Sequence, residues 1–181
     1  MKQKLCKKIL YDWWGFTTNI TEPRPDKYVI CLAPHTSNWD FIIGILFSRA
    51  EGFVCHFMMK KEWFFWPLGL ILRHLGGVPV IRNKQTRATE LIAQKAIEKE
   101  KFHLCITPEG TRSKTSHWKH GFYYIALNAQ IPILLYGLDY EHKVIQCTKS
   151  IVPTGNVEEE MMEIKNYFKD FKGKYPQKFS I

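Results

Sequence analysis

With 181 residues, the chain is long enough for one domain with a substantial core and too short for two of ordinary size. Hydrophobic residues make up 45% of it and aromatic residues 14%, which excludes a disordered tail. The 26 Lys and Arg outnumber the 17 Asp and Glu, and the net charge of +9 predicts an anionic partner: nucleic acid, an anionic lipid surface, a phosphorylated substrate or an acidic carrier protein.

Cysteine usage and hydropathy indicate the compartment. The five cysteines are an odd number and contain no C-x-x-C pair, which argues against both a disulfide framework and a Cys-rich zinc site. The longest apolar run, residues 64–72, is far shorter than the roughly 20 residues of a spanning helix. The N-terminus also lacks the apolar stretch of a signal peptide. We therefore expect a cytoplasmic protein that can lie on the inner face of the cell membrane.

Residues 4–16 form the first predicted element, an amphipathic helix. Its apolar half contains Leu, Ile, Cys, Trp and Phe, and its other half contains three lysines. Basic residues opposite Trp and Leu are typical of a helix in a membrane interface. An ordinary surface helix packed on its own domain is the alternative. We assign residues 1–20 to this helix and residues 21–181 to one following domain.

From residue 28 onward, short apolar runs alternate with helical segments. The predicted strands are residues 28–33, 53–59, 78–81, 102–107, 132–138 and 142–148. The predicted helices are residues 41–50, 63–75 (a turn followed by a helix), 86–101, 121–130 and 157–171. This alternation predicts a single α/β domain with a largely parallel central sheet flanked by helices.

His35 and Asp40 lie where a predicted strand gives way to a helix, the position at which open α/β sheets tend to bind ligands. If His35 is in the turn and Asp40 in the first helical turn, the carboxylate can fold back onto the imidazole. It would then fix the imidazole tautomer and leave the other ring nitrogen as a general base. The alternative is a pair of residues that only cap the helix, for which residues 36–38 all supply capable N-cap side chains.

A second polar turn, residues 108–113 (PEGTRS), directly follows the predicted strand 102–107. Glu109 beside Arg112, across a conformationally free Gly110, makes a plausible anion pocket, because a guanidinium grips phosphate oxygens at two points. Arg82, at the end of an earlier strand, is a candidate second positive group. The alternatives are an exposed turn with an ion pair and a surface arginine.

Taken together and in this order, these segments resemble the glycerolphosphate acyltransferase family, which includes the 1-acylglycerol-3-phosphate acyltransferases. The matching blocks are the H-x4-D of residues 35–40, the glycine-rich turn and strand of 76–82, residues 108–113, and the proline-opened strand from 131. The resemblance covers residues 30–138. Thr107 departs from the family's usual Phe, and Pro34 from a frequent Asn. With no spanning helix, the chain resembles a short bacterial branch.

The resemblance implies roles for particular residues. His35 would deprotonate the acceptor hydroxyl, and Asp40 would orient His35. The acceptor phosphate would be held by Arg82, Glu109, Gly110, Thr111 and Arg112. The donor would be acyl-CoA or acyl-carrier protein, the acceptor a lysophospholipid, most simply 1-acylglycerol-3-phosphate, and neither cofactor nor metal is implied. The net charge agrees with an anionic membrane surface as a further partner.

Other interpretations remain open at this point. One alternative is a different acceptor, for example a lyso-aminolipid, which would leave Arg82 and Arg112 without a phosphate. A nucleic-acid-binding domain agrees with the charge but shows no recognisable motif. A non-catalytic lipid-binding relative is the third alternative. The aromatic segment 63–72 either helps an acyl chain to enter or belongs to the core.

Overall fold

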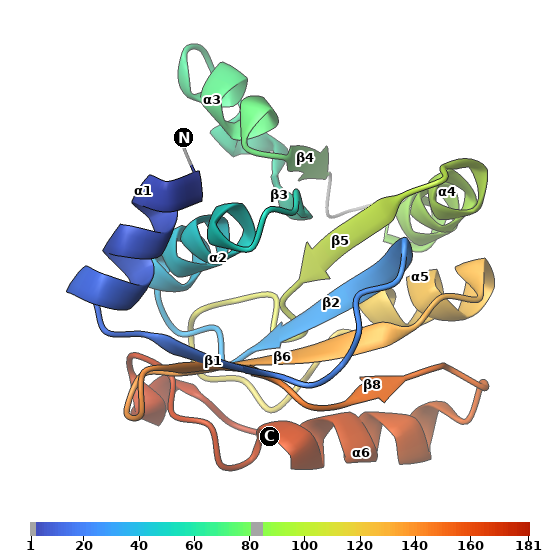
Figure 1. Cartoon of the computed structure of the whole chain (residues 1–181). Helices are drawn as coiled ribbons and strands as arrows, with labels where there is room; N and C mark the ends of the chain where they lie inside the picture. The colour runs from blue at the N-terminus through green and yellow to red at the C-terminus, as the bar shows by residue number, and fades with distance from the viewer. Residues whose placement is uncertain (1–2, 81–84) are drawn as a thin grey trace.

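The computed structural model describes residues 3–80 and 85–181 and has a single central sheet (Figure 1). Its strands are β1 (Thr17–Ile20), β2 (Lys27–Ala33), β3 (His56–Lys60), β4 (Gly77–Val80), β5 (Phe102–Ile106), β6 (Ile133–Asp139), β7 (Val144–Cys147) and β8 (Ser150–Ile151). The strand order is β1-β7-β6-β2-β5-β3-β4, and β8 pairs with β6. β2 runs parallel to both β5 and β6, whereas β7 and β8 are antiparallel to β6. The predicted α/β class with a largely parallel sheet is confirmed.

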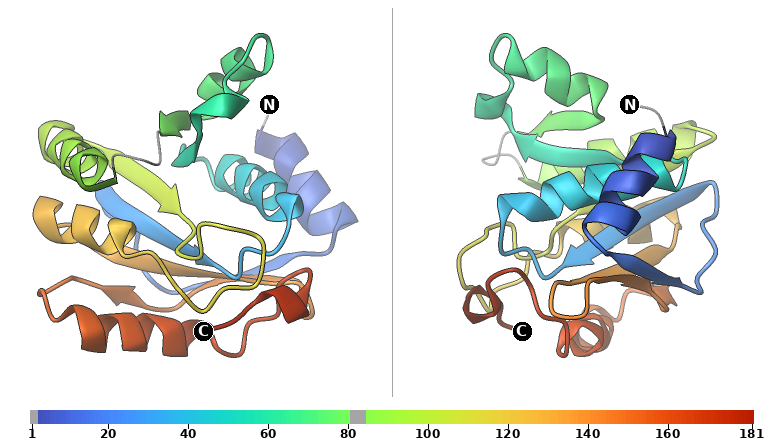
Figure 2. Two further views of the ribbon diagram at one scale, coloured as in Figure 1. Left: turned by 180° about the vertical axis from the view of Figure 1, so that it is seen from behind. Right: turned by 60° about the vertical axis from the view of Figure 1, so that its left-hand side comes forward.

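Helices cover both faces of this sheet (Figure 2). They are α1 (Gln3–Lys7), α2 (Asn38–Ala50), α3 (Leu68–His74), α4 (Gln85–Glu98), α5 (Gly121–Ala129) and α6 (Val157–Phe168). Along β2, Val29 and Cys31 pack with the cores of α4, α5 and α6, whereas Tyr28 and Ile30 pack with α1 and α2. This alternation follows from the two-residue period of a strand. Because helices cover both faces of the sheet, the central strand β6 is buried along its whole length.

The N-terminal segment packs on its own domain. α1 continues as a π-helix, Lys8–Trp13, and together they bury Cys6 and Leu10 completely beside α2. Leu5 and Trp13 remain 46% and 66% exposed. β1 follows directly and joins the sheet beside β7. The sequence pattern did not predict β1. Contact of this helix with a membrane therefore stays a prediction, with few apolar side chains available for it.

The segment between β3 and β4 lies at one edge of the sheet, away from the helical layers (Figure 1). It contains a short 3-10 helix, Lys61–Trp63, and α3, where one longer turn-helix segment was expected. β3 begins at His56 rather than at the predicted residue 53. Other predicted elements agree within a few residues, although β8 was not predicted. None of the helices in the described part of the chain has the length and hydropathy needed to cross a bilayer.

Candidate active site

The turn between β2 and α2 is built by a capping box. Ser37 is the N-cap of α2, and its Oγ accepts a hydrogen bond from the Trp39 N–H. Asp40, at the third helical position, accepts from the N–H of Ser37 at 2.9 Å and from that of Thr36 at 2.8 Å. Such reciprocal bonds satisfy the free N–H groups at a helix start. The helix start therefore fixes the position of the Asp40 carboxylate.

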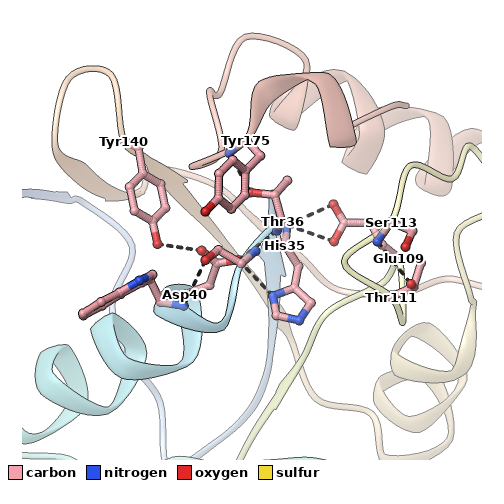
Figure 3. Close-up of polar contacts among 10 residues, drawn as sticks. His35, Thr36, Asp40, Glu109, Thr111, Ser113, Tyr140 and Tyr175 are labelled. Atoms are coloured by element: carbon pink, nitrogen blue, oxygen red, sulfur yellow. Dashed lines mark hydrogen bonds and ion pairs between the residues drawn. The ribbon is translucent and has the colours of Figure 1, made fainter.

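The same carboxylate meets the His35 imidazole, as the sequence predicted. His35 Nδ1 lies 3.0 Å from Asp40 Oδ2, with Asp40 completely buried and the His35 side chain 19% exposed (Figure 3). The sequence left a helix cap and a His–Asp pair as alternatives. In the structure, the Asp40 carboxylate both caps α2 and contacts His35. Because an ionised carboxylate only accepts hydrogen bonds, the arrangement favours a proton on Nδ1 and leaves Nε2 without one.

Tyr140, between β6 and β7, completes the surroundings of Asp40 and was missed by the sequence reasoning. Its hydroxyl donates a 2.6 Å hydrogen bond to Asp40 Oδ1 (Figure 3). Burial and Asp40 raise the pKa of this phenol well above its usual value, which keeps the hydroxyl protonated as a donor. One hundred residues separate the two side chains, so no local pattern announces the contact.

The C-terminal tail closes over the same turn. The Tyr175 N–H donates to Thr36 Oγ1 at 3.2 Å, and the Tyr140 N–H donates to the carbonyl of Lys172 at 2.8 Å. Gly173 lies so close that a Cβ added there would be 2.7 Å from Thr36 Oγ1. The tail therefore covers the turn on the side of Thr36.

Glu109 occupies a different place from the one its neighbour Arg112 suggested. It is buried, and both its carboxylate oxygens accept from the backbone N–H of His35, at 3.0 and 2.9 Å (Figure 3). No ion pair joins Glu109 to Arg112 among the described residues. Burial raises the pKa of Glu109 to about 8, the His35 N–H opposes that shift, and the nearby Asp40 charge adds to it. This contact supports a role for Glu109 in holding His35 rather than a phosphate.

The raised pKa gives a first prediction, that Glu109→Gln gains stability relative to wild type as pH rises. Between pH 4.5 and about 8 the unfolded glutamate ionises more readily than the folded one, so the wild type loses stability with rising pH. Each unit of pKa difference corresponds to about 1.4 kcal/mol, so the whole effect is at most a few kcal/mol. The amide oxygen still accepts from His35.

Thermal unfolding of both proteins across this pH range measures the effect. The exposed Glu158, changed to Gln, serves as the control. A constant difference between wild type and Glu109→Gln at all pH values would contradict the prediction.

Next to Glu109, the chain turns into a cavity of about 1260 Å³ that His35 also lines. Gly110 makes the turn with φ +63°, a conformation that favours glycine. Thr111 and the exposed Arg112 line the cavity mouth together with a further cation, Lys119. His35, Gly110, Thr111 and Arg112 are thus brought to one cavity. Arg82 lies outside the described residues.

The cavity extends from this polar mouth into an apolar region between α2 and the sheet. That region is lined by Phe41, Phe47, Phe53, Phe57, Met58, Tyr136 and Ile145. The combination of a polar mouth beside a His–Asp pair and a long apolar interior suits an amphiphilic substrate with an alkyl chain. Within residues 3–80 and 85–181, no three His, Cys, Asp or Glu side chains gather as a metal site would require.

Comparison with known proteins shows the family to which this fold and this site belong. The family model described as Acyltransferase matches residues 16–135. The chain belongs to this acyltransferase family. The match includes both polar turns and the strands that carry them.

Individual relatives add detail. The chain is 32% identical over 132 residues to a probable 1-acyl-sn-glycerol-3-phosphate acyltransferase of Mycoplasma pneumoniae. That alignment covers 66% of this chain and 48% of the relative. It is 30% identical to the human 1-acyl-sn-glycerol-3-phosphate acyltransferase beta, covering 67% of this chain and 46% of the relative. The coconut 1-acyl-sn-glycerol-3-phosphate acyltransferase is 37% identical over 111 residues, which cover 58% of this chain and 35% of the relative. The chain thus spans less than half the length of these curated relatives.

A solved structure shares the fold. The crystal structure of the 1-acyl-sn-glycerophosphate acyltransferase PlsC from Thermotoga maritima superposes with a TM-score of 0.63. The match covers 92% of this chain and 75% of that one, at 19% sequence identity.

Proposed function

We propose that this protein transfers a fatty acyl group from acyl-CoA or acyl-carrier protein to the hydroxyl of 1-acylglycerol-3-phosphate, giving phosphatidate for phospholipid synthesis. The observation that carries the proposal is the His35–Asp40 pair, 3.0 Å apart, at the polar mouth of a cavity with an apolar interior. Membership of the family supports the reaction type. The acceptor named in the relatives, 1-acyl-sn-glycerol-3-phosphate, supports the choice of acceptor.

In the proposed reaction, His35 Nε2 takes the proton of the acceptor hydroxyl as its oxygen attacks the thioester carbonyl. The tetrahedral intermediate collapses, the carbon–sulfur bond breaks and an ester remains. The imidazolium returns its proton to the departing thiolate, so the enzyme ends unchanged. Asp40, held by the Tyr140 hydroxyl and two backbone N–H groups, keeps Nδ1 protonated and stabilises the positive imidazolium. The reaction draws on no cofactor beyond the thioester, which is a substrate.

The acceptor phosphate is proposed to lie at the cavity mouth beside Thr111, Arg112 and Lys119. Arg112 supplies a guanidinium fork suited to phosphate, and Lys119 adds a second charge. Arg82 remains a candidate for a further contact. Gly110 lets the backbone approach closely, and Glu109 acts through its hold on His35.

We also propose that the protein works as a peripheral protein on the inner face of the cell membrane, where its acceptor is found. The net charge of +9 supports attraction to anionic lipids. The same charge suits an acidic carrier protein as donor, and no motif for specific nucleic-acid binding accompanies it.

The test is a transfer assay with labelled palmitoyl thioesters of CoA and of carrier protein. Lysophosphatidate is compared with a lysolipid that lacks the phosphate, using wild type and His35→Ala. We expect phosphatidate to form only with intact His35. Product from the phosphate-free acceptor alone would overturn the assignment of the acceptor while keeping the reaction. No transfer from either donor to either acceptor would overturn the proposal.

Arg112→Ala gives a second prediction, an increase in the acceptor KM of about tenfold or more. A charge-assisted contact to phosphate is worth about 1.5 to 3 kcal/mol, and the proposal assigns this contact to the acceptor. Steady-state kinetics with lysophosphatidate and palmitoyl-CoA separates the two KM values. Lys114→Ala is the control, because Lys114 is exposed two residues further on and does not line the cavity. Equal changes in both KM values would contradict a phosphate-binding role.

A further inference from the structure

Large apolar side chains are exposed on the segment between β3 and β4. Phe65 is 58% exposed, Trp66 82%, Leu70 64% and Ile71 55%, and Trp63 beside them is 47% exposed. We call these five residues the apolar tip. They lie on the part of the molecule that stands away from both helical layers (Figures 1 and 2).

The tip is a firmly built structure and not a frayed loop. Leu72 is buried on the inner side of α3. A Cβ added at Gly69 would lie 2.6 Å from the carbonyl oxygen of Phe64, and one at Gly77 would lie 2.8 Å from that of Leu72. These close approaches show that α3 packs tightly against Phe64 on one side and against Gly77 at the start of β4 on the other, which leaves Leu70 and Ile71 exposed.

The charges around the tip are almost all positive. Lys60, Lys61 and Arg73 are exposed beside it. Glu62 is the only acidic residue in the sequence from position 52 to 89. Tryptophans and aliphatic side chains with a basic rim match an anionic bilayer, where Trp sits at headgroup level and Lys and Arg meet the lipid charges.

The tip is also continuous with the reaction cavity. Lys60 and Trp63 line that cavity together with His35. A lipid held at the tip therefore has a route along the cavity to His35. Self-association through the tip is less suited, because a seven-residue helix is only about 10 Å long, whereas a stable dimer buries about 800 Å² on each partner.

We propose that the apolar tip is the surface by which this protein docks on an anionic phospholipid bilayer and receives its lipid substrate. This inference rests on the proposed function, since it names the membrane contact of the same site. It moves that contact from the N-terminal helix, whose Cys6 and Leu10 are buried beside α2, to the edge of the sheet.

The test compares a tip variant, Leu70→Glu with Ile71→Glu, with a matched control, Leu91→Glu with Ile97→Glu. The control residues are 53% and 57% exposed on α4, so both variants change two exposed apolar side chains to the same charge. A third variant, Leu5→Glu with Trp13→Glu, examines the N-terminal helix. Binding is measured by flotation with vesicles of phosphatidylcholine, with and without phosphatidylglycerol. Turnover is measured separately with short-chain substrates that stay in solution.

We expect the tip variant to bind phosphatidylglycerol-containing vesicles at least about tenfold more weakly than wild type, because it lacks two exposed aliphatic side chains that docking would bury in the bilayer. The control should bind as wild type does, and turnover of soluble substrates should persist in both. Vesicle binding within about twofold of wild type in the tip variant would overturn the proposal. An equal loss in the α4 control, a larger loss in the N-terminal variant, or a wild-type dimer that the tip variant abolishes would overturn it as well.

Failure of the proposed function is distinguishable from these outcomes. A wild type that binds vesicles through the tip but transfers no acyl group to any acceptor would leave the docking surface standing. It would overturn the reaction alone.

Discussion

Replacing His35 by alanine is expected to reduce acyl transfer by at least about 10² and up to about 10⁴, the range that a positioned general base contributes. The alanine removes Nε2, which is proposed to take the hydroxyl proton. It also removes the Nδ1 contact with Asp40. The backbone N–H that donates to Glu109 remains, so the turn keeps its second anchor. Initial rates with saturating lysophosphatidate and palmitoyl-CoA measure the change.

The chain offers a matched control for this variant. His142 Nδ1 lies 2.8 Å from Asp139 Oδ2, so it forms a pair of the same kind, but its side chain is 69% exposed and does not line the cavity. His142→Ala should keep wild-type activity. Activity of His35→Ala within about threefold of wild type, with unfolding temperatures unchanged in both, would contradict the general-base role.

Asp40→Asn is expected to have the second large effect, a fall in kcat of about 10² to 10⁴. Exchanging the carboxylate partner of a catalytic histidine for an amide costs up to about 10⁴ in serine-protease triads, where the wrong tautomer results. At Asp40 the change is unfavourable in either amide orientation. Four donors surround the carboxylate, from His35, Thr36, Ser37 and Tyr140, and one of the two amide positions is itself a donor.

Because Asp40 also caps α2, the effect of Asp40→Asn on stability must be separated from its effect on activity. Ser37→Ala removes the N-cap side chain without touching the His35–Asp40 pair, and it should cost about 1 kcal/mol of stability. Its kcat should stay near that of wild type. If Ser37→Ala loses as much kcat as Asp40→Asn does, helix capping and not the orientation of His35 explains the loss.

Much of the site was predictable because its parts are local in sequence. The strand-to-helix change at residues 28–50 follows from hydrophobic pattern and N-cap chemistry, and it places His35 and Asp40 in contact. The parallel sheet then brings the turn after β5 beside the turn after β2, since adjacent parallel strands end at one edge. Those two rules are enough to gather His35, Gly110 and Arg112 around one cavity.

The parts that sequence reasoning missed depend on contacts between distant segments. Glu109 beside Arg112 suggested an anion pocket, with an exposed ion pair as the alternative. The tertiary fold instead buries the Glu109 carboxylate on the His35 backbone, 74 residues away. Tyr140 lies on the hairpin between β6 and β7, where no sequence pattern predicts a hydrogen bond to Asp40. The face of the N-terminal helix looked suited to lipid, yet α2 presents an apolar surface that covers Cys6 and Leu10. Periodicity identifies an apolar face and does not identify what covers it.

The tail that covers Thr36 has a consequence for the order in which this protein matures. Residues 27–50, which carry His35 and Asp40, are synthesised well before Tyr140 and Tyr175. Until they arrive, the Asp40 carboxylate lacks one of its donors and the turn lacks its cover. The proposed catalytic turn is thus expected to be complete only after Tyr175 has been synthesised and has folded back onto Thr36.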